Sequence, residues 1–353
     1  MWKLEYLPVA EDVETKKVLK QLPKSHRALA ELKGIASTIP NQSILINTLV
    51  LQEAKDSSAV ENIITTHDEL YKAELHFENI QSISAKEVQN YISALKRGFG
   101  LVKKNQLLTT NQIIQIQQEL EKNNAGLRKV PGTSLKNERT NQVIYTPPQD
   151  YKTIEGLMGN LESFINNDEL SDLDPLVKMA IIHHQFESIH PFYDGNGRTG
   201  RIINILYLVL NDLLNIPILY LSRYIIQHKS EYYKYLQDVR DNGNWENWII
   251  YILKAVEEIA QQTIEVIKEM KALMAQYKNT IRENYKFYSQ DLLNNLFKHP
   301  YTKISFLQED LKISRPTASA YINQLASDGL LVKKKVGTAH YYINAPLYEL
   351  LMR

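Results

Sequence analysis

The sequence predicts a mainly α-helical protein that carries two short β-hairpins. Only 13 Gly and 12 Pro interrupt the 353 residues, and between them apolar residues recur at helical spacing. One example is Ile113 and Ile116, which follow a helix start signal at Thr109. Two segments depart from this pattern, 126–150 and 301–353, and both contain short runs typical of strands. At this length we expect two or three domains that fold without disulfides or a structural metal.

The composition excludes several classes of protein. Lys and Arg number 41 against 40 Asp and Glu, a net charge of +1, whereas a general binder of nucleic acid or anionic membranes carries a larger excess. The absence of cysteine excludes a disulfide scaffold, a thiolate nucleophile and a cysteine-ligated metal. Residues 1–17 lack the apolar core of a secretory signal, and Asn, Asp and Pro interrupt the apolar run 202–221. We therefore expect a cytoplasmic protein without a membrane span.

The N-terminal part of the chain, residues 1–104, reads as a helical region. A helix is expected through the apolar residues of Ile44–Leu51, with a break at Lys55–Ser58. A helical core is expected to follow over residues 105–255.

Within this core, residues 126–150 read as a hairpin-like projection. Gly132 favours a turn, Val143–Tyr145 has a strand pattern, and Pro147–Pro148 closes the segment. An ordinary surface loop is the alternative for this segment taken alone, although loops of this length are uncommon without a role.

Residues 256–298 are expected to form a long helical connector, as one helix or as two in succession. An apolar stripe runs along it and indicates either core packing or the seam of a homodimer. The stripe consists of Ile259, Val266, Ile267, Met270, Leu273, Met274, Tyr277 and Ile281.

The last part, residues 299–353, has the outline of a winged helix-turn-helix. A short helix over 304–311, a turn, and a second helix capped by Ser314 precede two alternating strands around Gly337. From Tyr301 onward seven Lys and Arg residues stand against four acidic ones. This unit could bind DNA or dock a protein, and the side chains that would face DNA are Arg315, Thr317, Ser319, Asn323, Lys333, Lys334 and Lys335.

The densest chemical signal is the run HHQFESIHPFYDGNGRTGR at residues 183–201. Gly195, Asn196 and Gly197 open a predicted helix, so their backbone N–H groups and the positive helix end suit a phosphate. Arg198 and Arg201 lie three residues apart on that helix and can bind further phosphate oxygens.

Two more residues of this run complete the pattern. Asp194 lies beside the anion site, where phosphate would repel a carboxylate, so we expect it to bind Mg²⁺. His190 is the group there that can accept a proton near neutral pH. Zinc binding through His183, His184 and His190 is a minor alternative, because their spacing is not that of metal ligands on a helix. The combination indicates phosphoryl or nucleotidyl transfer.

The segment His190–Arg201, HPFYDGNGRTGR, resembles the signature of the Fic family, HPFx[D/E]GNGRxxR, at every fixed position. The resemblance covers about residues 105–255 and implies a Fic-type helical core. It also implies transfer of AMP from ATP to a Ser, Thr or Tyr hydroxyl of a target protein, or of the chain itself, with pyrophosphate leaving. His190 would deprotonate that hydroxyl, and Asp194 would hold Mg²⁺.

The resemblance also implies a nucleotide site and a docking site. Residues expected to bind the nucleotide are Gly195, Asn196, Gly197, Arg198, Thr199, Gly200 and Arg201 of the motif, with Tyr232, Tyr233 and Asn244 as candidates for the adenine pocket. The segment ending in IYTPP resembles the flap of the family, so Val143, Ile144 and Tyr145 would hold the target by strand addition.

A second match lies upstream of the core. Ser57, Glu61 and Asn62 occupy the fixed positions of the inhibitory pattern of the family, [S/T]xxxE[G/N]. The resemblance implies that Glu61 pairs with Arg201 when ATP is absent. It also implies that Glu61 lies at the nucleotide site. The alternative is a capping box at a helix start, formed by Ser58 and Glu61.

The sequence therefore predicts a self-inhibited, ATP- and Mg²⁺-dependent protein adenylyltransferase. One alternative is removal of AMP from a modified target, with Glu61 orienting a water molecule. Others are transfer of a different phosphate-containing group, and a DNA-binding regulator whose core senses a nucleotide. The sequence does not identify the target protein.

Overall fold

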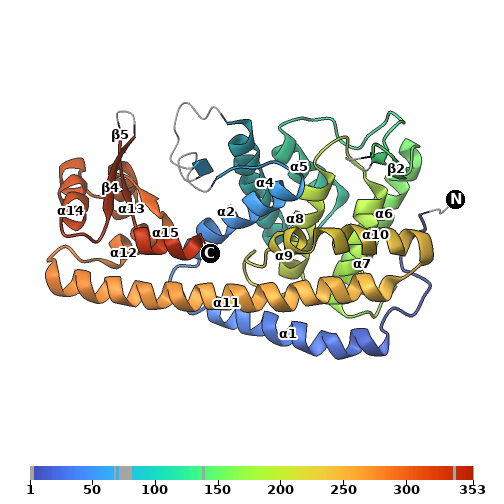
Figure 1. Ribbon diagram of the computed structural model, residues 1–353, viewed down its shortest axis with the longest axis horizontal. Coiled ribbons are helices and arrows are strands. Elements are labelled where there is room, and N and C mark those ends of the chain that lie inside the picture. The colour runs from blue at the N-terminus through green and yellow to red at the C-terminus, as the bar shows by residue number, and fades with distance from the viewer. Residues whose placement is uncertain (1–3, 67–68, 71–81, 137–139, 337–338, 353) are drawn as a thin grey trace.

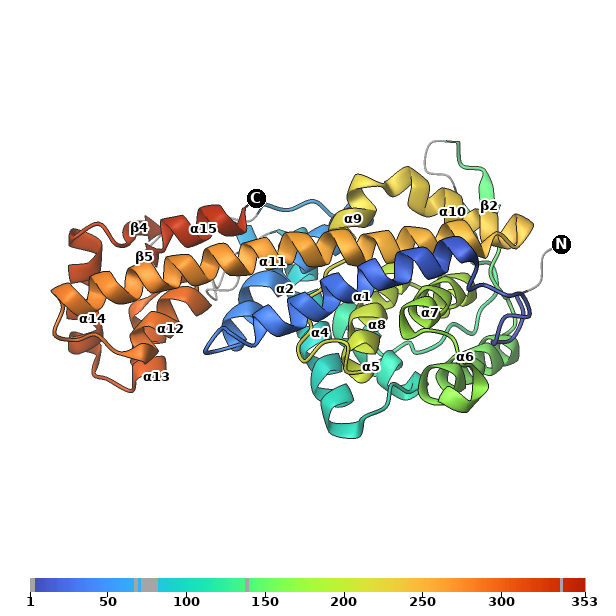
Figure 2. The ribbon, with the colours of Figure 1, turned by 90° about the horizontal axis from the view of Figure 1, so that it is seen from below.

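A single long helix, α11 (Trp245–Asn284), connects the two parts of this mostly helical chain (Figure 1). The computed structural model describes residues 4–66, 69–70, 82–136, 140–336 and 339–352. Helix α1 (Lys16–Ala36) lies along α11 in both views (Figure 2), and Ser25 donates a hydrogen bond to the Leu253 carbonyl at 2.7 Å. No helix in these ranges is long and apolar enough to cross a membrane.

Helix α2 (Ser43–Val60) differs from the prediction, because it continues through Lys55–Ser58 without a break. Ala54, Ser57 and Ser58 are buried in its last turns, so tertiary packing outweighs the low helix propensity of the Asp-Ser-Ser run. Glu61 therefore follows a helix end, and the capping box at a helix start does not exist. Ser57 and Glu61 are one turn apart at that end, followed along the chain by α4 (Ile83–Asn105).

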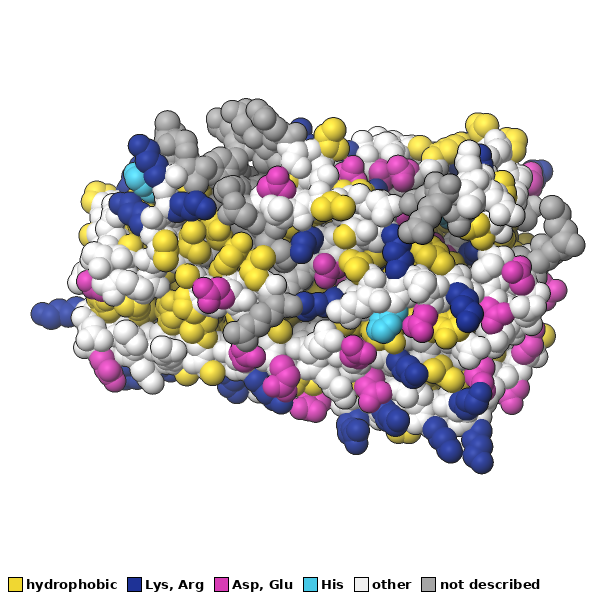
Figure 3. Space-filling model, viewed as in Figure 1, with side chains coloured by type: hydrophobic (Ala, Val, Ile, Leu, Met, Phe, Trp, Pro, Cys, Tyr) yellow, Lys and Arg dark blue, Asp and Glu magenta, His cyan; other side chains and the backbone are white. Residues whose placement is uncertain are grey.

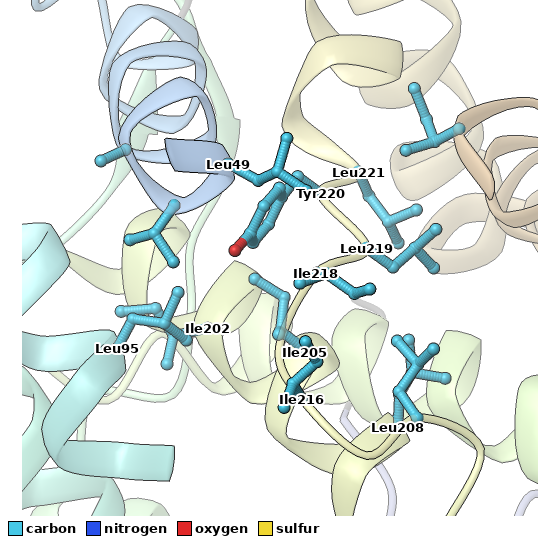
Figure 4. Close-up of a cluster of buried hydrophobic side chains, with 14 of the residues drawn as sticks. Leu49, Leu95, Ile202, Ile205, Leu208, Ile216, Ile218, Leu219, Tyr220 and Leu221 are labelled. Carbon is cyan, nitrogen blue, oxygen red and sulfur yellow. The ribbon is translucent and has the colours of Figure 1, made fainter. Parts of the chain in front are cut away.

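The helical core surrounds α8 (Asn196–Leu210), the predicted motif helix, which is buried along most of its length. Helices α2, α4, α5 (Thr110–Glu121) and α7 (Pro175–Ile189) pack against α8. Helix α6 (Tyr151–Asn166) packs against α7, α9 (Ser222–Gln227) against α2, and α10 (Lys229–Asn242) against α11, with a short 3₁₀ helix at Asp168–Leu170. Thr109 caps α5 as predicted. Figure 4 shows Leu49 of α2, Leu95 of α4 and Ile202 of α8 in one apolar cluster with the segment 216–221.

The projection on this core is a small hairpin, as predicted. Strand β1 (Leu135–Lys136) pairs antiparallel with β2 (Val143–Tyr145), and Leu135 lies opposite Tyr145. The hairpin precedes α6 and lies near α10 (Figure 1).

The predicted apolar stripe is buried inside the chain. Ile259, Ile267, Met270 and Met274 of α11 are at most 5% exposed, which is core packing and not a free seam between two copies. Helix α11 is continuous across the predicted boundary at residues 255–256, and α12 (Gln290–Lys298) follows it.

The C-terminal unit has the predicted order of elements. Helix α13 (Ile304–Leu311), α14 (Arg315–Ser327), β4 (Val332–Val336) and β5 (Ala339–Ile343) are followed by α15 (Ala345–Leu351), and β3 (Tyr301–Thr302) extends the sheet to the order β3-β5-β4. Ser314 caps α14 by accepting a hydrogen bond from the Thr317 N–H at 3.3 Å. Gly337 lies outside the described residues.

Candidate active site

A cavity of about 670 Å³ opens where the end of α7 meets the start of α8. The hairpin and α10 complete its walls, and its volume is in the range of small-molecule sites. Its lining residues are Glu61, Ser134, Leu135, Lys136, Ile144, Tyr145, Glu187, His190, Gly197, Arg201, Lys229, Ser230, Tyr232, Tyr233, Leu236, Gln237 and Arg240. The structure thus brings the upstream Glu61 to the motif.

His190 terminates α7 and faces this cavity. Its backbone has φ 48°, its N–H donates to the Phe186 carbonyl at 3.0 Å, and Arg128 Nε donates to its own carbonyl at 2.8 Å. Burial, with the charges of Arg128 and Arg240, lowers the pKa of His190 to about 4. The imidazole is therefore neutral at neutral pH, as a proton acceptor must be.

The glycine turn fixes the start of α8. Gly195 has φ 75°, a conformation that favours glycine, and it caps the helix. The Asn196 side chain accepts from the Phe192 N–H and donates to the Phe192 carbonyl, both at 2.8 Å, so this amide closes the turn and is not free to bind a phosphate. A Cβ at Gly197 would lie 2.2 Å from Glu61 Oε1, so a larger residue at this position would displace the carboxylate from its present place.

Arg201 connects the motif helix to the end of α2. Its side chain is only 2% exposed, and its Nη2 donates to Glu61 Oε1 at 2.9 Å. Nε donates to Ser57 Oγ and Nη2 to the Ser57 carbonyl, both at 2.8 Å. Burial alone would raise the pKa of Glu61, but the attraction and hydrogen bond of Arg201 outweigh it, so the pKa is lowered and Glu61 is ionised at neutral pH.

Asn62 and Lys229 hold the chain just beyond Glu61. Lys229 Nζ donates to the Val60 carbonyl at 2.7 Å and to Asn62 Oδ1 at 3.3 Å. Asn62 has φ 62°, which explains why glycine or asparagine suits this position of the inhibitory pattern.

Arg198 does not join Arg201 in the cavity lining. It is 5% exposed and pairs with Glu87 of α4 at 3.0 Å and Glu121 of α5 at 2.9 Å. The three-residue spacing puts both arginines on one side of α8, but the two guanidinium groups turn to different neighbours. Thr199 and Gly200 are buried and also lie outside the lining.

The three candidates for the adenine pocket separate in the structure. Tyr232 and Tyr233 line the cavity, and the Tyr232 hydroxyl hydrogen-bonds to His183 Nε2 at 2.9 Å. Asn244 does not line it, because its amide donates to Asp238 at 2.7 Å and fixes the turn between α10 and α11.

Models of known protein families match three parts of this chain. Residues 107–208 match the model of the Fic/DOC family, and residues 19–100 match the N-terminal model of the same family. The C-terminal domain model of SoFic-like protein adenylyltransferases matches residues 273–347. The chain belongs to the Fic family.

The similar Fic proteins cover parts of this chain. A protein adenylyltransferase Fic of Aedes aegypti is 27% identical over 183 residues, 51% of this chain and 33% of that protein. A probable protein adenylyltransferase of Aquifex aeolicus is 38% identical over 81 residues, 23% of this chain and 24% of that protein. These matches thus span a third or less of the relatives.

Solved Fic structures share the fold of the chain. A crystal structure of a Fic family protein from Desulfovibrio desulfuricans has a TM-score of 0.61 at 19% identity, covering 96% of this chain and 98% of its own. Fic-1 from C. elegans has a TM-score of 0.54 at 18% identity, covering 71% of this chain and 74% of its own. The likeness shows the Fic fold and not the substrate.

Asp194 of the Fic motif fits the demands of Mg²⁺. The side chain is exposed, and Oδ1 accepts the Gly195 N–H at 2.7 Å. Mg²⁺ is commonly held by one or two carboxylates together with water and substrate phosphates, so a single carboxylate beside a phosphate site suffices. Within the described ranges, no group of three His, Cys, Asp or Glu side chains is placed to hold a metal ion by itself.

Sequence reasoning missed four charged residues of the cavity, namely Lys136, Glu187, Lys229 and Arg240. Burial raises the pKa of Glu187 to about 7 against the opposing charge of Arg201. Arg240 lies 3.9 Å from the centre of the Tyr145 ring of the flap. Glu187 precedes His190 by one helical turn and could have been found by that spacing, whereas nothing in the sequence connects Arg240 to the motif.

Proposed function

We propose that this Fic protein is an ATP- and Mg²⁺-dependent protein adenylyltransferase that Glu61 holds in an inactive resting state. One observation carries the proposal: a neutral histidine, Gly197 at the start of the motif helix and a carboxylate-paired arginine line the same cavity. The family relatives named protein adenylyltransferases support it.

In the proposed reaction, the hydroxyl oxygen of a target Ser, Thr or Tyr bonds to the α-phosphorus of ATP. The bond from that phosphorus to the bridging oxygen breaks, and pyrophosphate leaves. The hydroxyl proton passes to His190. The N–H groups of Asn196 and Gly197 and the positive end of α8 stabilise the phosphate charge. Mg²⁺, held by Asp194, would offset the charge of the phosphate oxygens.

The resting state follows from the pairing of Arg201 with Glu61. The carboxylate occupies the side of the guanidinium that faces the cavity, where a γ-phosphate would bind. ATP can then enter only with its phosphates displaced, and misalignment of a reacting phosphorus can lower the rate by about 10²-fold.

Target docking is assigned to the flap. Val143 and Ile144 are about half exposed on the short strand β2, and Tyr145 is anchored by donating to the Ser188 carbonyl at 2.7 Å. An anchored strand with exposed neighbours suits addition of an extended target segment. Removal of AMP is a second candidate for the same site, since the ionised Glu61 in the cavity could orient a water molecule.

For the C-terminal unit we propose a winged helix-turn-helix that binds DNA. Lys333, Lys334 and Lys335 are exposed on β4, and Figure 3 shows basic side chains gathered over β4 and β5. Asn323 contributes less than the sequence predicts, because its Oδ1 already accepts from Lys333 at 2.7 Å and from Tyr342 at 2.9 Å. Phosphate contacts by the lysines would therefore dominate.

The adenylyltransferase proposal is tested by following the phosphorus atoms of ATP. The Glu61→Gly variant is incubated with a cell lysate and ATP labelled at either the α- or the γ-phosphate, and intact masses are measured. Protein should acquire α-label and the mass of AMP, with no γ-label. Transfer of γ-label, or no transfer of either label, would contradict the proposal.

A further inference from the structure

Helix α2 carries a buried carboxyl group, that of Glu53, which the proposed mechanism does not use. Glu53 lies two turns before Glu61 and is 1% exposed. Ser222 Oγ donates to its Oε1 at 2.5 Å, and the Tyr91 hydroxyl donates to the same oxygen at 2.9 Å. A buried carboxyl near the inhibitory motif requires an explanation, because burying such a group costs free energy unless hydrogen bonds or an opposite charge compensate for it.

Glu53 is connected to Arg201 by a chain of hydrogen bonds. Arg201 Nε donates to Ser57 Oγ at 2.8 Å, the Ser57 hydroxyl hydrogen-bonds to the Tyr91 hydroxyl, and Tyr91 donates to Glu53. Each hydroxyl can accept one bond and donate the next, so all donors point from the arginine toward the carboxyl. We call this chain of Arg201, Ser57, Tyr91 and Glu53 the relay. Hydrogen bonds in such a chain polarise and strengthen one another.

The relay does not depend on Glu61. Arg201 makes three hydrogen bonds to the segment Ser57–Glu61, and the two to Ser57 remain when the Glu61 carboxylate is removed. Removing one partner of a buried ion pair normally leaves an uncompensated charge. This applies to Arg201, which is only 2% exposed and would keep only its hydrogen bonds to Ser57 after the loss of Glu61. Burial raises the pKa of Glu53 to about 7, and the hydrogen bonds from Ser222 and Tyr91 and the charge of Arg201 oppose that rise, so the carboxyl lies within electrostatic range of the arginine.

We propose that Glu53, acting through Tyr91 and Ser57, is a positioning residue that keeps Arg201 aimed into the cavity after Glu61 has been displaced. The same guanidinium orientation then serves the carboxylate at rest and the γ-phosphate of ATP in the active state. This inference rests on the proposed function, because it assigns the γ-phosphate to Arg201.

The test compares ATP with AMP, which has no γ-phosphate. Affinities of the full chain are measured by calorimetry, with Mg²⁺ present, in the Glu61→Gly background. Adding Tyr91→Phe should weaken ATP binding about three- to tenfold, the effect of losing one hydrogen bond on an equilibrium constant, and leave AMP binding unchanged. Glu53→Gln keeps the shape and, above the pKa of about 7 at which Glu53 ionises, removes the charge, so at about pH 8 it should act in the same direction. Tyr207→Phe, at a buried tyrosine of α8 outside the relay, is the matched control and should change neither affinity.

Each outcome decides a different point. Unchanged ATP affinity in both relay variants would overturn the inference, as would equal weakening of ATP and AMP, which indicates a general structural role. If Glu61→Gly binds ATP but transfers no AMP, the proposed function fails and the comparison of ATP with AMP still decides the relay. If Glu61→Gly binds neither nucleotide, both proposals fail.

Discussion

Replacing Glu61 by Gly should convert the resting chain into an active one. Arg201 loses the ion pair at 2.9 Å but keeps both hydrogen bonds to Ser57, so the guanidinium stays in place for a γ-phosphate. Glu61 follows the end of α2 with φ −91°, a conformation that glycine adopts freely. The substitution therefore removes a carboxylate without straining the backbone.

The size of the effect follows from the burial of the pair. A hydrogen bond to a charged group contributes about 1.5–3 kcal/mol. Arg201 is 2% exposed but Glu61 is 38% exposed, so water screens the pair and the lower part of that range applies. About 1.5–2 kcal/mol corresponds to a shift of roughly 10- to 30-fold in favour of the ATP-competent state.

The assay is incorporation of label from α-labelled ATP into the chain and into lysate proteins. Asn62→Gly is the matched control, since Asn62 has φ 62° and accepts glycine while Glu61 remains. Incorporation should rise about 10- to 30-fold in Glu61→Gly and stay near the parent in Asn62→Gly. Equal incorporation by the parent and Glu61→Gly would refute the assignment of Glu61 as an inhibitor.

Three further predictions concern other parts of the molecule. In the nucleotide-free chain, NMR should show His190 titrating near pH 4, because burial beside two arginines lowers its pKa. The imidazole should gain its proton only as the pH falls through that value, and a midpoint at the ordinary 6.5 would contradict this. Alanine at Lys333–Lys335 should flatten the salt dependence of duplex DNA binding by the full chain, and absence of binding by the parent at low salt would leave protein docking as the role of this unit. Gly98→Ala should lower the free energy of unfolding by about 1–3 kcal/mol, since its Cβ would lie 2.6 Å from Leu206 Cδ1, whereas Gly100→Ala on the same helix meets open space and should not lower the thermal midpoint.

Local signals predicted the elements that backbone chemistry determines. The glycine turn, the α5 cap at Thr109, the hairpin and the C-terminal order of elements all follow from short-range preferences, and the structure confirms them. The contact between Glu61 and Arg201 was accessible only through the family resemblance, because 140 residues separate the two in sequence.

Tertiary contacts explain what the sequence did not predict. Arg198 turns away from the cavity because Glu87 and Glu121 approach it from two other helices, and neither has a fixed spacing to the motif. Helix α2 passes through its predicted break because its last turns are buried against the core. Likewise, Arg240 reaches the cavity only through the packing of α10.

In the proposed reaction His190 removes the proton from the target hydroxyl. The most direct measurement compares Glu61→Gly with Glu61→Gly/His190→Ala for the rate of α-label incorporation and for ATP affinity. Loss of the general base should lower the rate by about 10²–10⁴, whereas ATP affinity should stay within a few-fold of Glu61→Gly because binding depends on the glycine turn and Arg201. Incorporation by the double variant within a few-fold of Glu61→Gly would contradict it.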